Sequence, residues 1–234
     1  MRQVMHIFKK EFKAYFVSPI AYIVIAVFLI VTGWFFFMAF FIFNEASLRN
    51  FFTLLPVIYS FVIPAITMRL VSEELNIGSY EILLTMPVTF TDVVLGKFFA
   101  SVGFIIAMLI PTIAYPLTVA TIGDLDWGPV FGGYTGAVLL GAAFSAIGLL
   151  ASSLTRNQII AFIIGMVICF SLTLIDKMLF FLPSSLLGIS AYLGADFHFQ
   201  NISKGIIDSR DIVYFISICF IGLYGANLVL QEKN

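Results

Sequence analysis

The chain has 234 residues, of which 61% are hydrophobic and only 11% are charged, and its mean hydropathy is +1.08. A soluble domain has roughly 45–50% apolar and about 25% charged residues, so this composition excludes a soluble globular protein and predicts an integral membrane protein. The net charge of −1 gives no reason to expect nucleic acid as a partner. The two cysteines lie in apolar runs, where a thiol behaves as a small hydrophobe, and they predict no disulfide framework.

Residues 1–17 predict an amphipathic helix that lies on the membrane surface. Val4, Phe8, Phe12 and Phe16 fall on one helical stripe, and basic residues fall on the other. A basic face favours the anionic cytoplasmic leaflet, so we expect membrane lipid to be a partner of this helix. The alternative is an ordinary basic flank before the first span. The basic face consists of Arg2, His6, Lys9, Lys10 and Lys13.

Six apolar runs follow, each of 17 residues or more, which predicts six transmembrane helices. The third run is longer than a hydrocarbon core of about 30 Å requires, so it should tilt, project beyond the lipid, or kink at Pro111 or Pro116. The fourth run has small residues at four-residue spacing, such as Gly132 and Gly136, which favour close helix packing. The expected fold class is all-α, with residues 1–234 forming a single polytopic domain. The runs are residues 20–43, 51–68, 93–122, 129–154, 158–174 and 212–230.

Lysine and arginine residues are distributed unevenly between the two sides of this topology. If the N-terminus is inside, eight of them lie in the cytoplasm and four lie outside. The positive-inside rule therefore predicts that the N- and C-termini are both cytoplasmic. The polar stretch between the second and third runs is then cytoplasmic, and the connection before the last run is external.

Residues 72–88 of the cytoplasmic stretch are interpreted as a coupling segment, in which Gly78 and Pro87 bracket one short helix. Ser79 suits the N-cap, Glu81 would lie in the first turn where the helix dipole favours a carboxylate, and Pro87 cannot continue the helix. The apolar residues of this helix are too few to span a bilayer, so they should dock onto protein or lie at the membrane surface. The alternative is a loop that only holds two spans together. The apolar residues are Ile82, Leu83 and Leu84.

The external connection, residues 176–211, is the second informative region. Pro183 breaks its apolar start into pieces too short to cross, which predicts a re-entrant or interfacial pair of short helices. His198 lies near Asp208 and Arg210 in the sequence. One alternative is therefore an intramembrane enzyme that uses His198 and Asp208 beside one outer pocket. One histidine with scattered carboxylates is a weak signal for metal binding, and we predict no metal site.

The sequence lacks a phosphate-binding loop. At Gly96-Lys97, Thr91 stands where the first glycine of such a loop belongs, and Phe98 follows the lysine. No charged residue lies near the middle of a predicted span, which argues against an ion-coupled carrier. Arg69 and Lys97 lie at span ends, where we expect them to extend toward the membrane surface. We therefore predict no enzymatic activity, and a partner must supply the energy for any transport.

The coupling segment resembles the EE..GT.E.LL..P....GK signature of type 2 ABC exporter permeases. The resemblance extends over the whole chain, since that family shows a basic amphipathic N-terminal helix, six spans and a re-entrant external segment. The chain departs from the pattern at Leu75 and Asn76, where the family usually has basic residues, and at Ser79, which replaces threonine but keeps the hydroxyl cap. The matching residues are Glu73, Glu74, Gly78, Ser79, Glu81, Leu83, Leu84, Pro87, Gly96 and Lys97.

The resemblance implies partners and a mechanism. Two permease halves pair, by default as a homodimer, and each places its coupling helix in a groove of a cytoplasmic ABC ATPase. Closure of the ATPase dimer then tilts the spans. Residues 79–87, including Tyr80, would make the main contact, flanked by Glu73, Glu74 and the N-terminal helix. ATP and Mg²⁺ would bind the partner ATPase, and this chain would bind no cofactor.

Within this family, residues 144–162 and 198–215 are similar to the permease subunit of gliding-motility ABC systems. Permeases for nitrous-oxide-reductase maturation are near relatives. The resemblance implies a bacterial inner-membrane exporter subunit. The alternative is a scaffold or mechanotransmission subunit that transports no substrate and passes ATP-driven motion through residues 176–211 to an extracytoplasmic accessory subunit.

Overall fold

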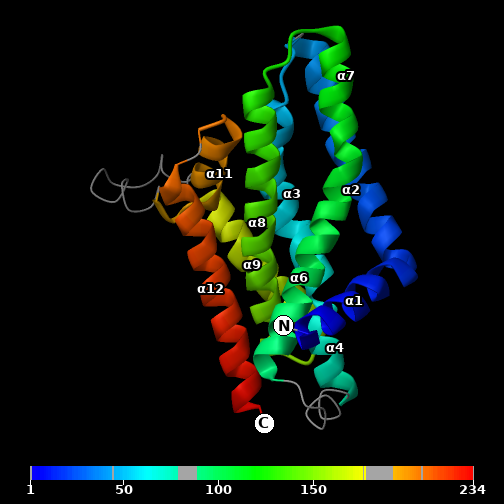
Figure 1. Ribbon diagram of the computed structural model, residues 1–234, viewed down its shortest axis with the longest axis vertical. Coiled ribbons are helices and arrows are strands. Elements are labelled where there is room, and N and C mark those ends of the chain that lie inside the picture. Colours follow the sequence, from blue (N-terminus) through cyan, green and yellow to red (C-terminus); the bar gives the residue numbers. More distant parts are fainter. Residues whose placement is uncertain are drawn as a thin grey trace.

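The computed structural model describes residues 2–43, 45–78, 89–175, 177, 192–206 and 208–233, and this part of the chain is helical, without strands (Figure 1). The predicted all-α class is therefore confirmed for the described residues. In chain order the elements are α1 (Arg2–Val17), α2 (Pro19–Phe43), α3 (Arg49–Thr67), α4 (Arg69–Ile77), α6 (Phe90–Leu109), the 3-10 helix η1 (Ile110–Ile113), α7 (Ala114–Ile122), α8 (Trp127–Leu154), α9 (Gln158–Leu174), α11 (Ala195–Ser203) and α12 (Ser209–Glu232).

Five helical segments in the described ranges are long and apolar enough to cross a membrane. Helix α9 is apolar but shorter, with 17 residues. The chain is thus a multi-pass membrane protein with five candidate spans, and the sixth crossing stays a prediction. The five segments are Pro19–Ile42, Arg49–Ile77, Phe90–Ile122, Trp127–Leu154 and Ser209–Glu232.

The predicted interruption of the third apolar run occurs at Pro111. Helix α6 ends at Leu109, η1 follows, and α7 continues to Ile122. Proline lacks the backbone N–H that an α-helix needs and crowds the preceding turn, so a tighter 3-10 turn is a common local solution. Pro116 lies within α7 and does not interrupt it.

Helix α8 occupies the centre of the bundle (Figure 1), and its small residues bring the neighbouring helices close. A Cβ atom added at Gly141 would lie 3.0 Å from Ile105 of α6. Ala146 of α8 meets Gly222 of α12, where an added Cβ would lie 2.8 Å from the Ala146 backbone carbon. The predicted close packing is confirmed, and these contacts lie within one chain.

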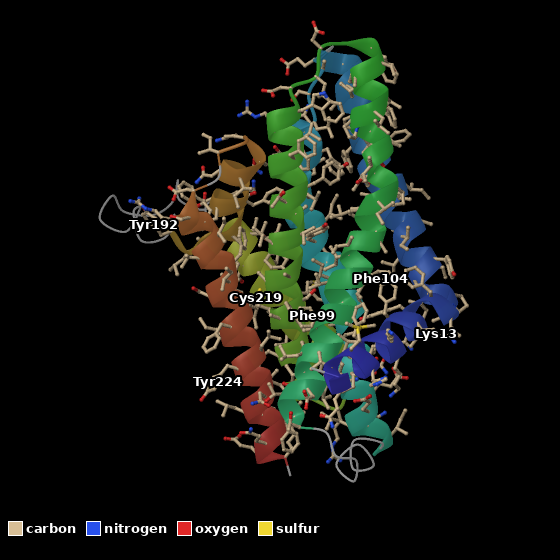
Figure 2. All side chains as sticks on the ribbon, viewed as in Figure 1. Lys13, Phe99, Phe104, Tyr192, Cys219 and Tyr224 are labelled. Atoms are coloured by element: carbon tan, nitrogen blue, oxygen red, sulfur yellow. The ribbon has the colours of Figure 1, made fainter. Side chains whose placement is uncertain are left out.

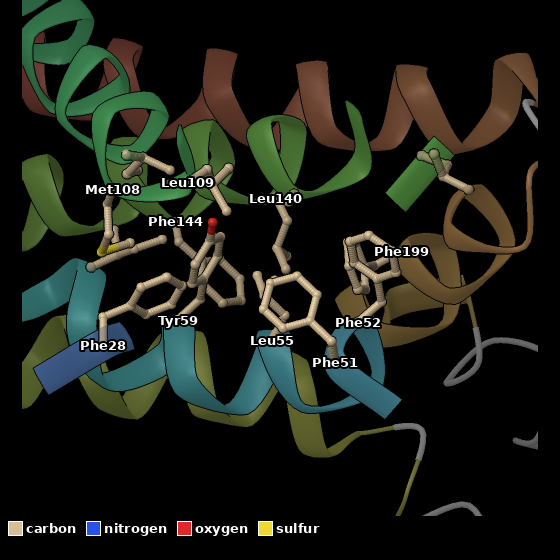
Figure 3. Packing of buried hydrophobic residues seen from close by; sticks show 14 of the residues in the cluster. Phe28, Phe51, Phe52, Leu55, Tyr59, Met108, Leu109, Leu140, Phe144 and Phe199 are labelled. Atoms are coloured by element: carbon tan, nitrogen blue, oxygen red, sulfur yellow. The ribbon is translucent and has the colours of Figure 1, made fainter. Parts of the chain in front are cut away.

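Large side chains fill the core on the side of α8 that faces α3 (Figure 3). Tyr59 of α3 and Phe144 of α8 are completely buried, and Phe28 of α2 packs on the Tyr59 ring. Phe199 extends this core to α11. Helices that bury such side chains on one face and expose apolar residues on the other are typical of a bundle embedded in lipid.

The N-terminal residues form α1, which packs against α6, and the predicted place of this helix on the membrane surface stays a prediction. Ile7, Glu11 and Tyr15 face α6, where the Tyr15 ring lies 4.9 Å from that of Phe104. Both chain ends and α4 lie at the lower end of the molecule in Figure 1, and the tip of α7 lies at the opposite end. The exposed basic face comprises His6, Lys9, Lys10 and Lys13, the last labelled in Figure 2.

Candidate functional site

Two well-defined helix ends flank the connection formed by residues 79–88. Helix α4 ends at Gly78, whose φ of 77° is the left-handed conformation that glycine adopts at low cost. Helix α6 begins with a reciprocal capping box, in which the Thr89 hydroxyl accepts from the Asp92 backbone N–H and the Asp92 carboxylate accepts from the Thr89 N–H, both at 3.2 Å. The breaker predicted at Gly78 is confirmed, and the base of the connection is fixed on both sides.

A buried lysine of α6 joins three helices near these two helix ends. The Lys97 side chain is 2% exposed, and its Nζ lies 2.8 Å from Glu74 Oε1 of α4 and 3.3 Å from Glu11 Oε1 of α1. The same Nζ donates to the Leu70 carbonyl oxygen at 2.6 Å. We call these four groups the Lys97 junction. A buried ammonium requires such compensation, since removal from water costs several kcal/mol or more. The expectation that Lys97 extends toward the membrane surface is wrong.

Gly96, next to Lys97, explains how Glu11 reaches the junction. A Cβ atom at Gly96 would lie 2.6 Å from Ile7 Cγ2 and 3.2 Å from the Val4 carbonyl oxygen. Any larger residue would therefore push α1 away from α6. The Gly-Lys pair at the end of the signature allows close approach of the N-terminal helix and supplies the cation that holds it.

Ser152 of α8 holds the first turn of α4. No side chain within α4 caps that turn, but Ser152 Oγ accepts from the Val71 N–H at 3.1 Å and from the Ser72 N–H at 3.0 Å. The Ser152 hydroxyl donates to the Met68 carbonyl oxygen at 2.8 Å. Two backbone N–H groups in the first turns of α4 thus find their side-chain acceptor on a neighbouring helix. The sequence does not indicate this role of Ser152, because a serine in a helix rich in small residues is expected to serve close packing. The role becomes visible only in the tertiary structure.

We predict that Ser152→Ala lowers the free energy of unfolding by about 1–3 kcal/mol, because two buried N–H donors lose their acceptor. Ser153→Ala is the matched control: Ser153 is also buried, but its hydroxyl donates only within α8, to Leu150 at 2.7 Å. Denaturant titration of the purified protein in mild detergent measures both variants. Equal losses for the two serines would contradict this role of Ser152.

The other predicted coupling residues fall into two groups. Glu73 forms an i,i+4 ion pair with Arg69 at 3.4 Å, with both side chains partly exposed, whereas Glu74 is part of the Lys97 junction. The lysines of α1 lie on its exposed face, and Lys10 Nζ is 3.8 Å from Glu11. Ser79, Tyr80, Glu81, Leu83, Leu84 and Pro87 lie outside the described residues.

A second buried polar pair joins α11 to α12. His198 Nδ1 of α11 is 2.6 Å from Asp211 Oδ1 of α12, and the two side chains are 3% and 4% exposed. His198 Nε2 lies 3.0 Å from the Tyr192 carbonyl oxygen, and the Tyr214 ring stacks on the imidazole with a centroid distance of 4.0 Å. Each ring nitrogen thus lies within hydrogen-bonding distance of an oxygen atom, which fixes the orientation of the imidazole ring.

The structure therefore pairs His198 with Asp211 rather than with Asp208. Asp208 caps α12 by accepting from the Arg210 backbone N–H at 3.0 Å, at an exposed position. This arrangement gives no support to a shared catalytic pocket for His198 and Asp208. The predicted short helices around Pro183 lie outside the described residues.

The fold and the Lys97 junction define a polytopic helical membrane protein with a fixed polar base at the end that holds both termini. The family described as "ABC-2 family transporter protein" matches residues 44–193. This match covers more than half of the chain, so the protein belongs to the ABC-2 family of transporter proteins. It is a membrane permease subunit of an ABC transporter, a class that associates with a cytoplasmic ABC ATPase. No curated protein matches the chain.

Proposed function

We propose that the chain couples ATP hydrolysis by its partner ATPase to export, with residues 79–88 as the element that contacts the ATPase. The observation that carries this proposal is the Lys97 junction. It lies at the base of the connection and joins the helix before it, α4, to the helix after it, α6. A movement applied to residues 79–88 would therefore displace both helices together.

The contacts around the junction give this movement a route into the bundle. The ion pair between Glu11 and Lys97 links α1 to α6, and the hydrogen bonds of Ser152 link the central helix α8 to α4. Both helices would therefore move with α4 and α6. Helix α4 continues α3 with only Met68 between them. A displacement of the connection thus acts on five packed helices, α1, α3, α4, α6 and α8, as required of a rigid element that carries coupling between distant sites.

The proposed orientation places this end of the molecule in the cytoplasm. The exposed lysines of α1 lie at this end, as the positive-inside rule requires. Six crossings, with α9 as the fifth, bring both termini to this side of a bacterial inner membrane. At about 1.5 Å per residue, α9 would span about 25 Å. Two such permeases would pair, as a homodimer, above the ATPase dimer.

The proposal is tested by Glu81→Ala combined with Leu84→Ala in the contacting element. We expect co-purification of the ABC ATPase to fall about tenfold or more, because a few apolar and charged residues carry most of an interface's energy, while membrane insertion is unchanged. The matched control is Ile122→Ala with Asp124→Ala, an exposed apolar and acidic pair at the opposite end. An unchanged yield of ATPase with the first pair would refute the assignment.

A second candidate function is force transmission without a transported substrate. The buried His198–Asp211 pair favours it, since the pair fixes the external helix α11 to the first turn of α12. The similarity of residues 198–215 to gliding-motility permeases supports the same function. In this case an extracytoplasmic accessory subunit would receive the motion. Stimulation of the complex's ATPase activity by a defined small molecule or lipid substrate would argue for export instead.

A further inference from the structure

A pocket of about 210 Å³ opens where α1 turns into α2, and no step of the proposed coupling uses it. Its apolar wall contains Ala21 of α2, Ile66 of α3 and Phe104 of α6, which are 3%, 6% and 1% exposed. Phe104 is labelled at α6 in Figure 2. Ala14 and Ala65 also line the pocket, and their small side chains leave it open. Water would find few hydrogen-bonding partners along this wall.

The lining of the pocket includes charged residues of both signs. Arg69 and Glu73 line it as an ion pair with an N–O distance of 3.4 Å, and their side chains are 36% and 40% exposed. Glu11 also lines the pocket, and its side chain is 15% exposed. Burial first, and the Glu11 carboxylate second, raise the pKa of Tyr15, so the Tyr15 hydroxyl in the lining stays neutral. A guanidinium and two carboxylates thus stand above an apolar cavity.

We propose that this pocket binds a phospholipid that has a phosphate and a primary-amine headgroup, such as phosphatidylethanolamine. The guanidinium of Arg69 matches the phosphate, which arginine binds through paired N–H donors. The ammonium group has three N–H donors for Glu73 and Glu11, whereas a choline headgroup has none. The start of an acyl chain fits the wall of Ala21, Ile66 and Phe104.

The size and surroundings of the pocket agree with a lipid that is only partly enclosed. Sites that enclose a drug-sized ligand usually have about 300–1,000 Å³, so 210 Å³ accommodates the headgroup region and the first part of a chain. Ile20 and Val24 continue the lining along α2, and Ile23 and Val27 beyond them are exposed apolar residues. The rest of the chain would lie along this helix in the membrane.

Glu11 belongs to both the pocket and the Lys97 junction. A bound lipid would therefore lie against the residue that holds α1 to α6 and would fill the space behind the α1–α2 turn. Lipid binding in this pocket does not depend on the contact with the ATPase, and the experiment below measures lipid binding alone.

The test uses the full-length chain in phosphatidylcholine vesicles that contain a trace of photoactivatable lipid, either phosphatidylethanolamine or phosphatidylcholine with the same diazirine acyl chain. We expect the ethanolamine lipid to label peptides of the α1–α2 turn and of α3–α4 about tenfold more than the choline lipid, as charge-assisted hydrogen bonds to the ammonium require. Equal labelling by the two lipids would overturn the proposal.

Two substitutions locate the site. Ala65→Phe fills the pocket and should reduce labelling by the ethanolamine lipid about fivefold or more, as loss of the apolar wall predicts, whereas Ala120→Phe, at an exposed alanine of α7, should not change it. Glu73→Gln should remove the preference for ethanolamine and keep the weaker labelling. Ala14→Phe replaces Ala65→Phe if that variant does not fold. Full labelling of a folded, filled variant would contradict the site.

Discussion

Replacing Lys97 with methionine is expected to lower the free energy of unfolding by about 3–5 kcal/mol, because it leaves two buried or half-buried carboxylates without their cation. Glu74 and Glu11 would lose partners at 2.8 and 3.3 Å. Glu74 Oε2 is already buried without a hydrogen bond among the described residues. Without Lys97, the Glu74 carboxylate would therefore lose its ion-pair partner and gain no replacement from that oxygen. The measurement is denaturant or thermal unfolding in mild detergent.

Two further variants separate the ion pair from the volume of the side chain. Adding Glu11→Gln and Glu74→Gln to Lys97→Met should recover most of the lost stability, because no charge then stays buried. Lys13→Met, at an exposed lysine of α1, should cause no measurable change. A loss below about 1 kcal/mol for Lys97→Met alone would show that the Lys97 junction does not hold these helices.

The second large effect is expected at the pair between α11 and α12. Asp211→Ala and His198→Ala should each cost about 3 kcal/mol or more, because each leaves a buried polar partner behind. The double variant should cost less than the sum of the two, with a coupling energy of about 2 kcal/mol for residues in direct contact. A double-mutant cycle of unfolding free energies measures this coupling.

Asp208→Asn provides the control for that cycle. Asparagine is as good an N-cap as aspartate, and the exposed Asp208 contacts the Arg210 N–H rather than His198, so stability should not change. If Asp208→Asn couples to His198 and Asp211→Ala does not, the assignment of the partner is wrong.

Hydrophobic patterning predicted most helices of this protein because lipid-facing helices are apolar for their whole crossing. The predicted run 158–174 coincides with α9, and the run 20–43 begins one residue after α2 does. The last helix starts earlier than predicted, at Ser209, because Asp208 caps a polar first turn that hydropathy cannot distinguish from a loop. For the same reason α4 was not predicted as a continuation of the second span.

The candidate site could be predicted only in part. Signature residues Glu74, Gly96 and Lys97 were recognised, but their contacts were not. The partner Glu11 lies 86 residues from Lys97, and no local pattern indicates that two helices so far apart in sequence will touch. The sequence suggests Asp208 as the partner of His198, because sequence distance does not show whether the N-cap residue Asp208 or the first-turn residue Asp211 of α12 faces α11.

The measurement that tests the central claim most directly is site-specific photo-crosslinking in cells that make the protein natively. A photoreactive amino acid replaces Tyr80 in the connection or Trp127, an exposed residue at the start of α8 near the opposite end. We predict that the probe at position 80 crosslinks to an ABC ATPase and that the probe at position 127 does not. A crosslink between position 127 and the ATPase would contradict the account. The absence of an ATPase crosslink at both positions would also contradict it.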